Sequence, residues 1–117
     1  MKIDEEKYGD VLVLHVRDRQ ITSHEAPEMK TVLLGALLGD SEKILLDLTD
    51  VDSMDSTGLG SLLFGIRQAE QRSKDLRFSG IQSKVSYLVH LARLEQVIEW
   101  YPTVEDALKD FQANETD

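Results

Sequence analysis

The chain has 117 residues, 41% of them hydrophobic and 30% charged, which is the size and composition of one globular domain with a single core. Its 22 acidic and 13 basic residues leave a formal net charge of −9, so direct binding to nucleic acid is not expected. The absence of cysteine excludes disulfides and thiolate chemistry, and the lack of long apolar runs or a signal-peptide pattern leads us to expect a cytoplasmic protein without membrane insertion.

The first elements along the chain are a hairpin and a helix. Residues 8–10 (Tyr-Gly-Asp) are a turn signal, and the β-branched run Val11–Val16 follows, which predicts an N-terminal β-hairpin. From residue 25 to 38, apolar residues recur at spacings of three and four, with Pro27 near the start and Gly39 at the end. This pattern predicts an amphipathic helix.

The middle of the chain predicts a strand, a connection and a second helix. Residues 43–48 form a short apolar run, typical of a central strand that is covered on both faces. Residues 49–55 are polar and acidic and predict a loop. Apolar residues at helical spacing then predict a helix that reaches about Ser73, so that the three segments form a crossover unit.

The last third of the chain continues this alternation. Residues 74–80 predict a strand, residues 83–92 a helix and residues 97–101 a strand that Pro102 ends, before a capping-box start at residues 103–106 opens a final helix. Residues 1–3 and 113–117 are expected to fray. The sequence therefore predicts one α/β domain with a mixed central sheet of about five strands and about four helices.

Motifs for cofactors and metals are not matched. Gly58 and Gly60 are followed by Leu63 where G-x-G-x-x-G requires glycine, and no Walker-type loop is present. The acids at positions 50, 52 and 55 lack the spacing of a calcium loop. We expect no cofactor, no metal and no catalytic residue; a metal-dependent phosphoryl-transfer enzyme remains an alternative, and its candidate ligands are Asp47, Asp50, Asp52 and Asp55. The histidines are expected to be structural or surface residues: His15, His24 and His90.

The segment at residues 54–60, Met-Asp-Ser-Thr-Gly-Leu-Gly, stands out because it lies at the carboxyl end of the central strand, where α/β folds usually place function. Ser56 or Thr57 is a suitable N-cap, and such a cap contributes about 1 kcal/mol. The two glycines in the first helical turn each cost about 1 kcal/mol relative to alanine. We therefore expect something to approach this backbone closely, such as a partner's active site.

Residues 44–48 and 51–60 together resemble the strand, loop and D-S-[ST]-G-[LI]-G phosphorylation motif of the STAS domain family, and within it the bacterial anti-anti-sigma factors, also called anti-sigma factor antagonists. The resemblance includes residues 26–30, Ala-Pro-Glu-Met-Lys, and runs from Val11 to Phe111. It implies the STAS fold for the whole domain, residues 1–117.

The resemblance implies a non-catalytic, partner-switching regulator of transcription. It places the phosphoacceptor at Ser56, with Thr57 as the second hydroxyl. The implied partners are an anti-sigma factor that is also a GHKL-type serine kinase and a PP2C-type phosphatase; the unphosphorylated protein binds the anti-sigma factor and frees the sigma factor. The expected partner-binding residues are Thr22, Ser23, Asp52, Met54, Asp55, Ser56, Thr57, Gly58, Leu59 and Gly60.

Two stretches of opposite charge flank this motif. Residues 40–55 hold six acids and one base, a net charge of −5 that is expected to face a basic or amide-rich partner surface. Residues 67–93 hold six bases and two acids, a net charge of +4. We expect the second stretch to be a solvated face, with a second contact surface as the alternative.

One departure from the family pattern lies before the first helix. Where relatives commonly have G-E-[LI]-D, this chain has Arg-Gln-Ile-Thr at positions 19–22, so Thr22 replaces the acid that lies near the phosphoacceptor. This replacement predicts altered kinase recognition, or partner binding without a full phosphorylation cycle. We expect residues 22–25 to act mainly as a capping box. The alternative function is a STAS scaffold or accessory subunit of a stress-signalling complex or membrane transporter.

Overall fold

The computed structural model describes residues 1–115, and within them the chain forms seven strands and four helices. The strands are β1 (Ile3–Tyr8), β2 (Val11–Val16), β3 (Gln20–Ile21), β4 (Lys43–Asp47), β5 (Ser53–Met54), β6 (Asp75–Ser79) and β7 (Trp100–Tyr101). The helices are α1 (Ala26–Leu37), α2 (Ser56–Gln71), α3 (Ser83–Leu91) and α4 (Val104–Glu115). No helix among these residues is long and apolar enough to cross a membrane.

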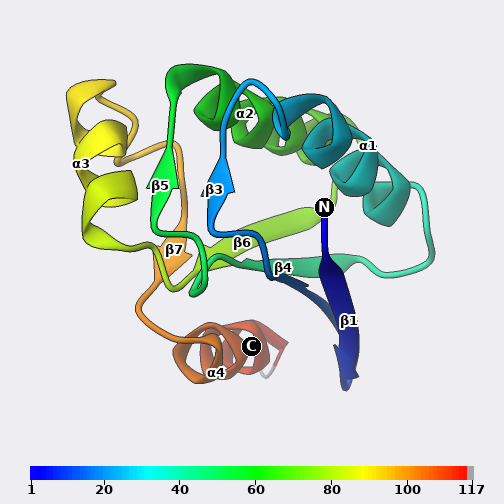
Figure 1. Cartoon of the computed structure of the whole chain (residues 1–117). Helices are drawn as coiled ribbons and strands as arrows, with labels where there is room; N and C mark the ends of the chain where they lie inside the picture. Colours follow the sequence, from blue (N-terminus) through cyan, green and yellow to red (C-terminus); the bar gives the residue numbers. More distant parts are fainter. Residues whose placement is uncertain (116–117) are drawn as a thin grey trace.

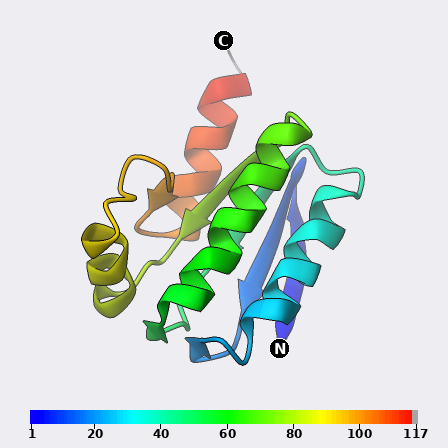
Figure 2. The ribbon, with the colours of Figure 1, turned by 90° about the horizontal axis from the view of Figure 1, so that it is seen from above.

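The main sheet has the strand order β1-β2-β4-β6-β7. The hairpin pair β1–β2 is antiparallel and the other pairs are parallel, which confirms the predicted mixed sheet. Gly9 closes the hairpin with a φ of +61°, a conformation that glycine adopts without steric cost. Helices α1 and α2 lie side by side on one face of the sheet and α4 lies on the other (Figures 1 and 2).

The core has two layers because the central strands are covered on both faces. The larger cluster lies between the sheet and helices α1 and α2, and includes Leu46, Leu62 and Phe78, each fully buried. The smaller cluster lies beneath α4 and joins Leu45 to Phe111. Alternate residues of β4 thus enter opposite layers, as the continuous apolar run predicts.

The structure corrects several predicted boundaries. The connection at residues 49–55 contains strand β5, which pairs in parallel with β3 to form a separate two-stranded sheet. Strand β7 contains two residues rather than five. At the N-terminus, where fraying of residues 1–3 was predicted, the backbone of Lys2 donates to Asp18 Oδ1 at 2.8 Å and Ile3 begins β1. Helix α4 continues through Glu115, so the predicted frayed tail is helical there; residues 116–117 lie outside the described part of the chain.

The basic stretch is not simply a solvated face, because Arg77 is 4% exposed beneath α4. Its guanidinium donates two hydrogen bonds to Asp75, at 2.8 and 2.9 Å, and one to Asp110, at 2.7 Å. The same group lies 4.2 Å from the centre of the Phe111 ring. Burial acts to lower the pKa of Arg77, but the neighbouring carboxylates of Asp75 and Glu99 outweigh it and raise the pKa. This buried cluster ties β6 to α4.

Candidate functional site

The small β3–β5 sheet holds the predicted switch motif against the segment before α1. In register, Gln20 lies opposite Ser53 and Ile21 opposite Met54. The backbone of Asp52 also donates to the Arg19 carbonyl at 2.8 Å. Residues 19–22, which replace the acidic family pattern, therefore lie directly beside the motif and not elsewhere on the surface. In Figure 1 both short strands point toward the N-terminal ends of α1 and α2.

Asp55 is the N-cap of α2, which corrects the prediction that Ser56 or Thr57 takes this role. Its Oδ1 accepts a hydrogen bond from the Gly58 backbone at 2.8 Å, and its Oδ2 accepts one from the Ser23 backbone at 3.0 Å. The Gly58 N–H is the largest cause of the lowered pKa of Asp55, because an amide that points at a carboxylate stabilises the charged form. One side chain thus fixes the helix start and the neighbouring loop.

The side chains of Ser56 and Thr57 therefore do not cap α2. Both are exposed, at the first two positions of α2. Neither hydroxyl has a hydrogen-bonding partner among the described residues. A hydroxyl presented in this way at a helix N-terminus is accessible to an enzyme, and the positive end of the helix dipole tolerates an added anion.

The two glycines of the motif have different surroundings. A Cβ atom at Gly58 would lie 1.9 Å from the Ile21 carbonyl oxygen, so this glycine is required by close packing within the domain itself. A Cβ atom at Gly60 would meet nothing within 4 Å. Packing against Ile21 thus accounts for Gly58 without a partner, and the interpretation that the glycines admit a partner stays a prediction.

The Thr22–Glu25 segment forms a local turn before α1, but it is not the predicted capping box, because the N-cap of α1 is Glu25 and no side chain caps the helix. The Thr22 backbone and hydroxyl both donate to Glu25 Oε1, at 2.9 and 2.8 Å. These bonds, the backbone one first, lower the pKa of Glu25. Thr22 is thus engaged with its own loop, whereas the side chain of Ser23 is exposed beside Asp55. In a capping box with Thr22 as N-cap the helix would begin at residue 23, whereas α1 begins three residues later, at Ala26.

The remaining predicted contact residues divide between surface and core. Asp52 is half-buried at the edge of the motif, where Arg19 donates to its Oδ2 at 2.8 Å and lowers its pKa. Met54 is half-buried and packs against the main core. Leu59 is 4% exposed, so its side chain is a core residue and is removed from the candidate contacts.

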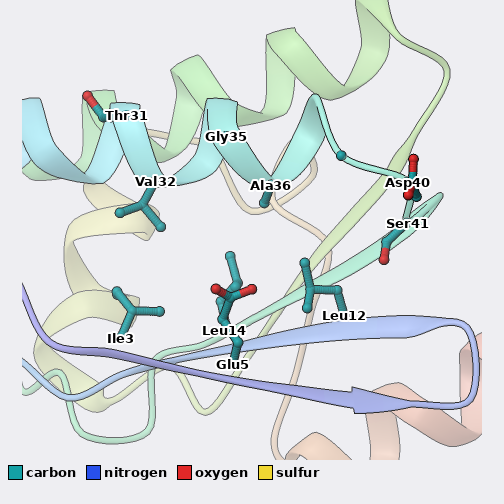
Figure 3. A pocket seen from close by; sticks show the side chains of 11 residues that line it. Ile3, Glu5, Leu12, Leu14, Thr31, Val32, Gly35, Ala36, Asp40 and Ser41 are labelled. Carbon is teal, nitrogen blue, oxygen red and sulfur yellow. The ribbon is translucent and has the colours of Figure 1, made fainter.

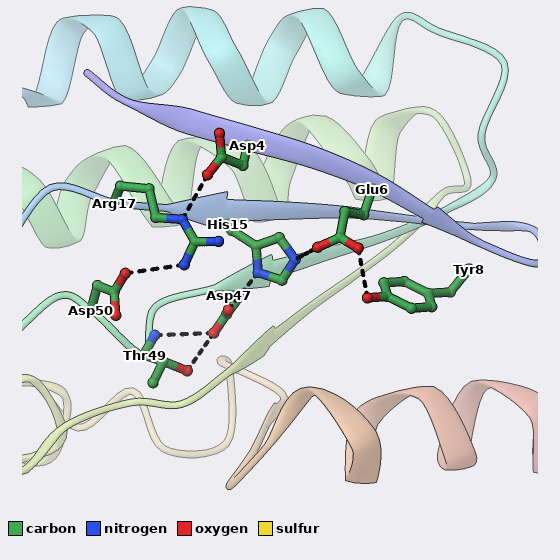
Figure 4. A network of polar contacts seen from close by, with 8 residues as sticks. All are labelled: Asp4, Glu6, Tyr8, His15, Arg17, Asp47, Thr49 and Asp50. Atoms are coloured by element: carbon green, nitrogen blue, oxygen red, sulfur yellow. Dashed lines mark hydrogen bonds and ion pairs between the residues drawn. The ribbon is translucent and has the colours of Figure 1, made fainter.

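The acidic stretch does not form one cluster, because the carboxylates of Asp47 and Asp50 have separate partners (Figure 4). His15 Nδ1 lies 2.6 Å from Asp47 Oδ2, and Arg17 Nη1 donates to Asp50 Oδ2 at 3.2 Å. Asp47 also accepts from the backbone and hydroxyl of Thr49. Within residues 1–115, no three His, Asp or Glu side chains come together in a way that would hold a metal ion. The four acids proposed for phosphoryl transfer therefore do not converge.

The family model described as the STAS domain matches residues 2–107. The chain belongs to the STAS domain family. A curated relative, the anti-sigma-B factor antagonist of Listeria monocytogenes, is 30% identical over 80 residues, which cover 68% of this chain and 70% of the relative. This relationship confirms the expected resemblance to anti-sigma factor antagonists.

Solved structures show the same fold for this STAS domain. An anti-sigma factor antagonist from Mycobacterium paratuberculosis superposes with a TM-score of 0.80 at 22% identity, covering 93% of this chain and 92% of that one. The Bacillus cell fate determinant SpoIIAA in its phosphorylated form superposes with a TM-score of 0.69 at 16% identity, covering 94% and 99%. The predicted STAS architecture is thereby confirmed.

The sequence reasoning missed the pairing of His15 with Asp47. His15 is 8% exposed and lies directly opposite Asp47 in the parallel register of β2 and β4. Its Nε2 is 2.9 Å from Glu6 Oε1 but has no aligned hydrogen bond. The available signal was that both residues are polar and lie near the ends of apolar runs, one predicted as a hairpin strand and the other as the central strand. The two side chains point toward each other from neighbouring strands (Figure 4).

Proposed function

We propose that this STAS domain is an anti-sigma factor antagonist whose binding to its partner is controlled by phosphorylation of Ser56. The curated relatives carry the name of this activity, and a Bacillus neighbour in the fold has been solved in a phosphorylated form. The observation that carries the proposal is the division of roles between Asp55 and Ser56. Asp55 caps the helix, so the exposed Ser56 hydroxyl accepts a phosphate without loss of that cap.

The phosphate acts on the interface rather than on the fold. It adds a charge of about −1.5 to −2 at pH 7, at a helix N-terminus that tolerates an anion. Asp55 and Asp52 already place negative charge beside Ser56. Burying a dianion there against a partner costs about 2–5 kcal/mol, and this weakens binding by about thirty-fold to several thousand-fold.

The proposed partners are an anti-sigma factor of the GHKL serine-kinase type, acting in the cytoplasm with ATP, and a PP2C-type phosphatase. The proposed contact surface includes the backbone of the first turn of α2. Its other members are the predicted residues that are exposed or half-buried: Thr22, Ser23, Asp52, Met54, Asp55, Ser56, Thr57 and Gly60. It lies over the β3–β5 sheet and the start of α2, where Thr22 replaces an acid. This replacement removes one negative charge near Ser56, so we propose that kinase recognition relies on Asp55 and Asp52 instead.

A binding assay with the anti-sigma factor tests whether negative charge at Ser56 controls binding. We expect Ser56→Ala to bind like the wild type and Ser56→Asp to bind at least about ten-fold more weakly, because the added charge enters a desolvated contact. Glu105→Gln, a charge change on α4 at the opposite face of the sheet, is the control and leaves affinity unchanged. Equal affinities of Ser56→Ala and Ser56→Asp would refute this control of binding.

A further inference from the structure

A groove of about 380 Å³ runs between the C-terminal half of α1 and the β1–β2 hairpin (Figure 3). We call it the α1 groove. Its walls are half-buried apolar side chains from both sides: Ile3, Leu12, Val32 and Ala36. Its size falls within the range of sites that hold small organic molecules.

The groove is open because α1 presents small residues where it passes over the hairpin. Gly35 lies in its wall, and a Cβ atom there would meet nothing within 4 Å. Gly35 is also in the interior of a helix, where glycine costs about 1 kcal/mol relative to alanine. The space is therefore not demanded by packing within the domain, in contrast to the space at Gly58.

Two carboxylates give the groove its chemical character. The Glu5 carboxylate rises between the strands and α1 among the apolar side chains, and Asp40 lies at the end of the groove beyond the helix (Figure 3). Neither side chain makes an ion pair or hydrogen bond within residues 1–115. The nearby cation, Lys74, donates to the Gly39 carbonyl instead. An apolar wall between two unpaired acids is complementary to an aliphatic chain that carries positive charges.

We infer that the α1 groove binds a free aliphatic diamine, with its methylene chain against Val32 and Leu12 and its ammonium groups near Glu5 and Asp40. The carboxylates disfavour anionic ligands, and the apolar wall disfavours a hydrated metal ion. The inference is independent of the proposed phosphorylation of Ser56, since the groove shares no residue with the switch motif.

The test is an NMR titration of the whole ¹⁵N-labelled chain with hexane-1,6-diamine. We expect saturable shift changes at the backbone amides of residues 3–5, 12–14 and 31–41. Hexane-1,6-diol, which has the same length without charge, is expected to bind about ten-fold more weakly. No saturable change with the diamine, or equal binding of the diol, would overturn the inference.

Two variants locate the ligand. Glu5→Gln is expected to weaken diamine binding about five-fold, because it removes one of the two charges. Gly35→Leu fills the groove from a helical position with open space and is expected to abolish saturable binding. Glu105→Gln removes the same charge from α4 and leaves binding unchanged. Binding that survives both Glu5→Gln and Gly35→Leu at wild-type strength contradicts the assignment.

Discussion

The switch motif on α2 and the Arg77 cluster beneath α4 both consist of charged and polar residues, yet they are built for opposite purposes. Around Arg77, each nitrogen of the buried guanidinium donates to a carboxylate or to the Tyr101 hydroxyl. The pKa of Tyr101 is raised to about 12 by burial and by its bond to Asp110. At the motif, Asp55 accepts a hydrogen bond from the Gly58 backbone, while the Ser56 hydroxyl is exposed and unpaired.

This difference shows that charge in the sequence does not by itself locate a functional surface. Both stretches are strongly charged, and the basic one contains a buried group that belongs to the core. What distinguishes the candidate site is a rigidly capped backbone beside a side chain without a partner. Substitutions that disturb the Arg77 cluster should change stability, and substitutions at exposed positions of the switch motif should change binding.

Removing the centre of the buried cluster should have the largest effect on stability. We expect Arg77→Ala to lower the free energy of unfolding by about 3 kcal/mol, because it leaves the acids around it without their cation and removes packing against Phe111. Urea unfolding measures this change. Arg67→Ala removes an exposed charge from the same stretch and should alter stability by no more than about 0.5 kcal/mol. Equal losses for the two variants would contradict the comparison.

The glycine pair separates internal packing from accessible surface within the motif. Gly58→Ala forces a methyl group against the Ile21 carbonyl and should destabilise the domain by about 1–3 kcal/mol. Gly60→Ala enters open space in a helix and should stabilise it by about 0.4–1 kcal/mol. Thermal and urea unfolding of the two variants test this order; a stable Gly58→Ala variant would show that α2 does not approach β3 as closely as described.

Loss of the Asp55 cap of α2 should have a smaller, pH-dependent effect on the free energy of unfolding. The pKa of Asp55 is lowered from its ordinary value of 3.8 in the folded state, so its ionised form stabilises folding above that value, and this contribution is lost as the pH falls through the folded-state pKa. Asp55→Ala should therefore be less stable than the wild type at neutral pH, and the difference should shrink in strongly acidic solution. Urea unfolding across this pH range measures it, and a constant difference would argue against the cap.

The order of elements was predictable because each helix has a 3.6-residue apolar pattern and the central strands are continuous apolar runs. The β3–β5 sheet was not, since two-residue strands such as Gln20–Ile21 have no periodicity to detect, and their pairing is a tertiary contact. The cap was also mispredicted, because local residue preference favoured Ser56 or Thr57. The side chain that accepts the Gly58 N–H is that of Asp55. Ser56 itself was found through the motif, and its exposure is what the structure adds.

The central claim is that Ser56 is the phosphoacceptor. Incubation of the protein with its cognate kinase and ATP, followed by mass spectrometry, tests it most directly, with Ser56→Ala and Thr57→Ala compared in parallel. The account predicts a single phosphate on Ser56 in the wild type and in Thr57→Ala, and none in Ser56→Ala. A Ser56→Ala protein that is still phosphorylated to the wild-type extent, or a phosphate mapped to another residue, would contradict it.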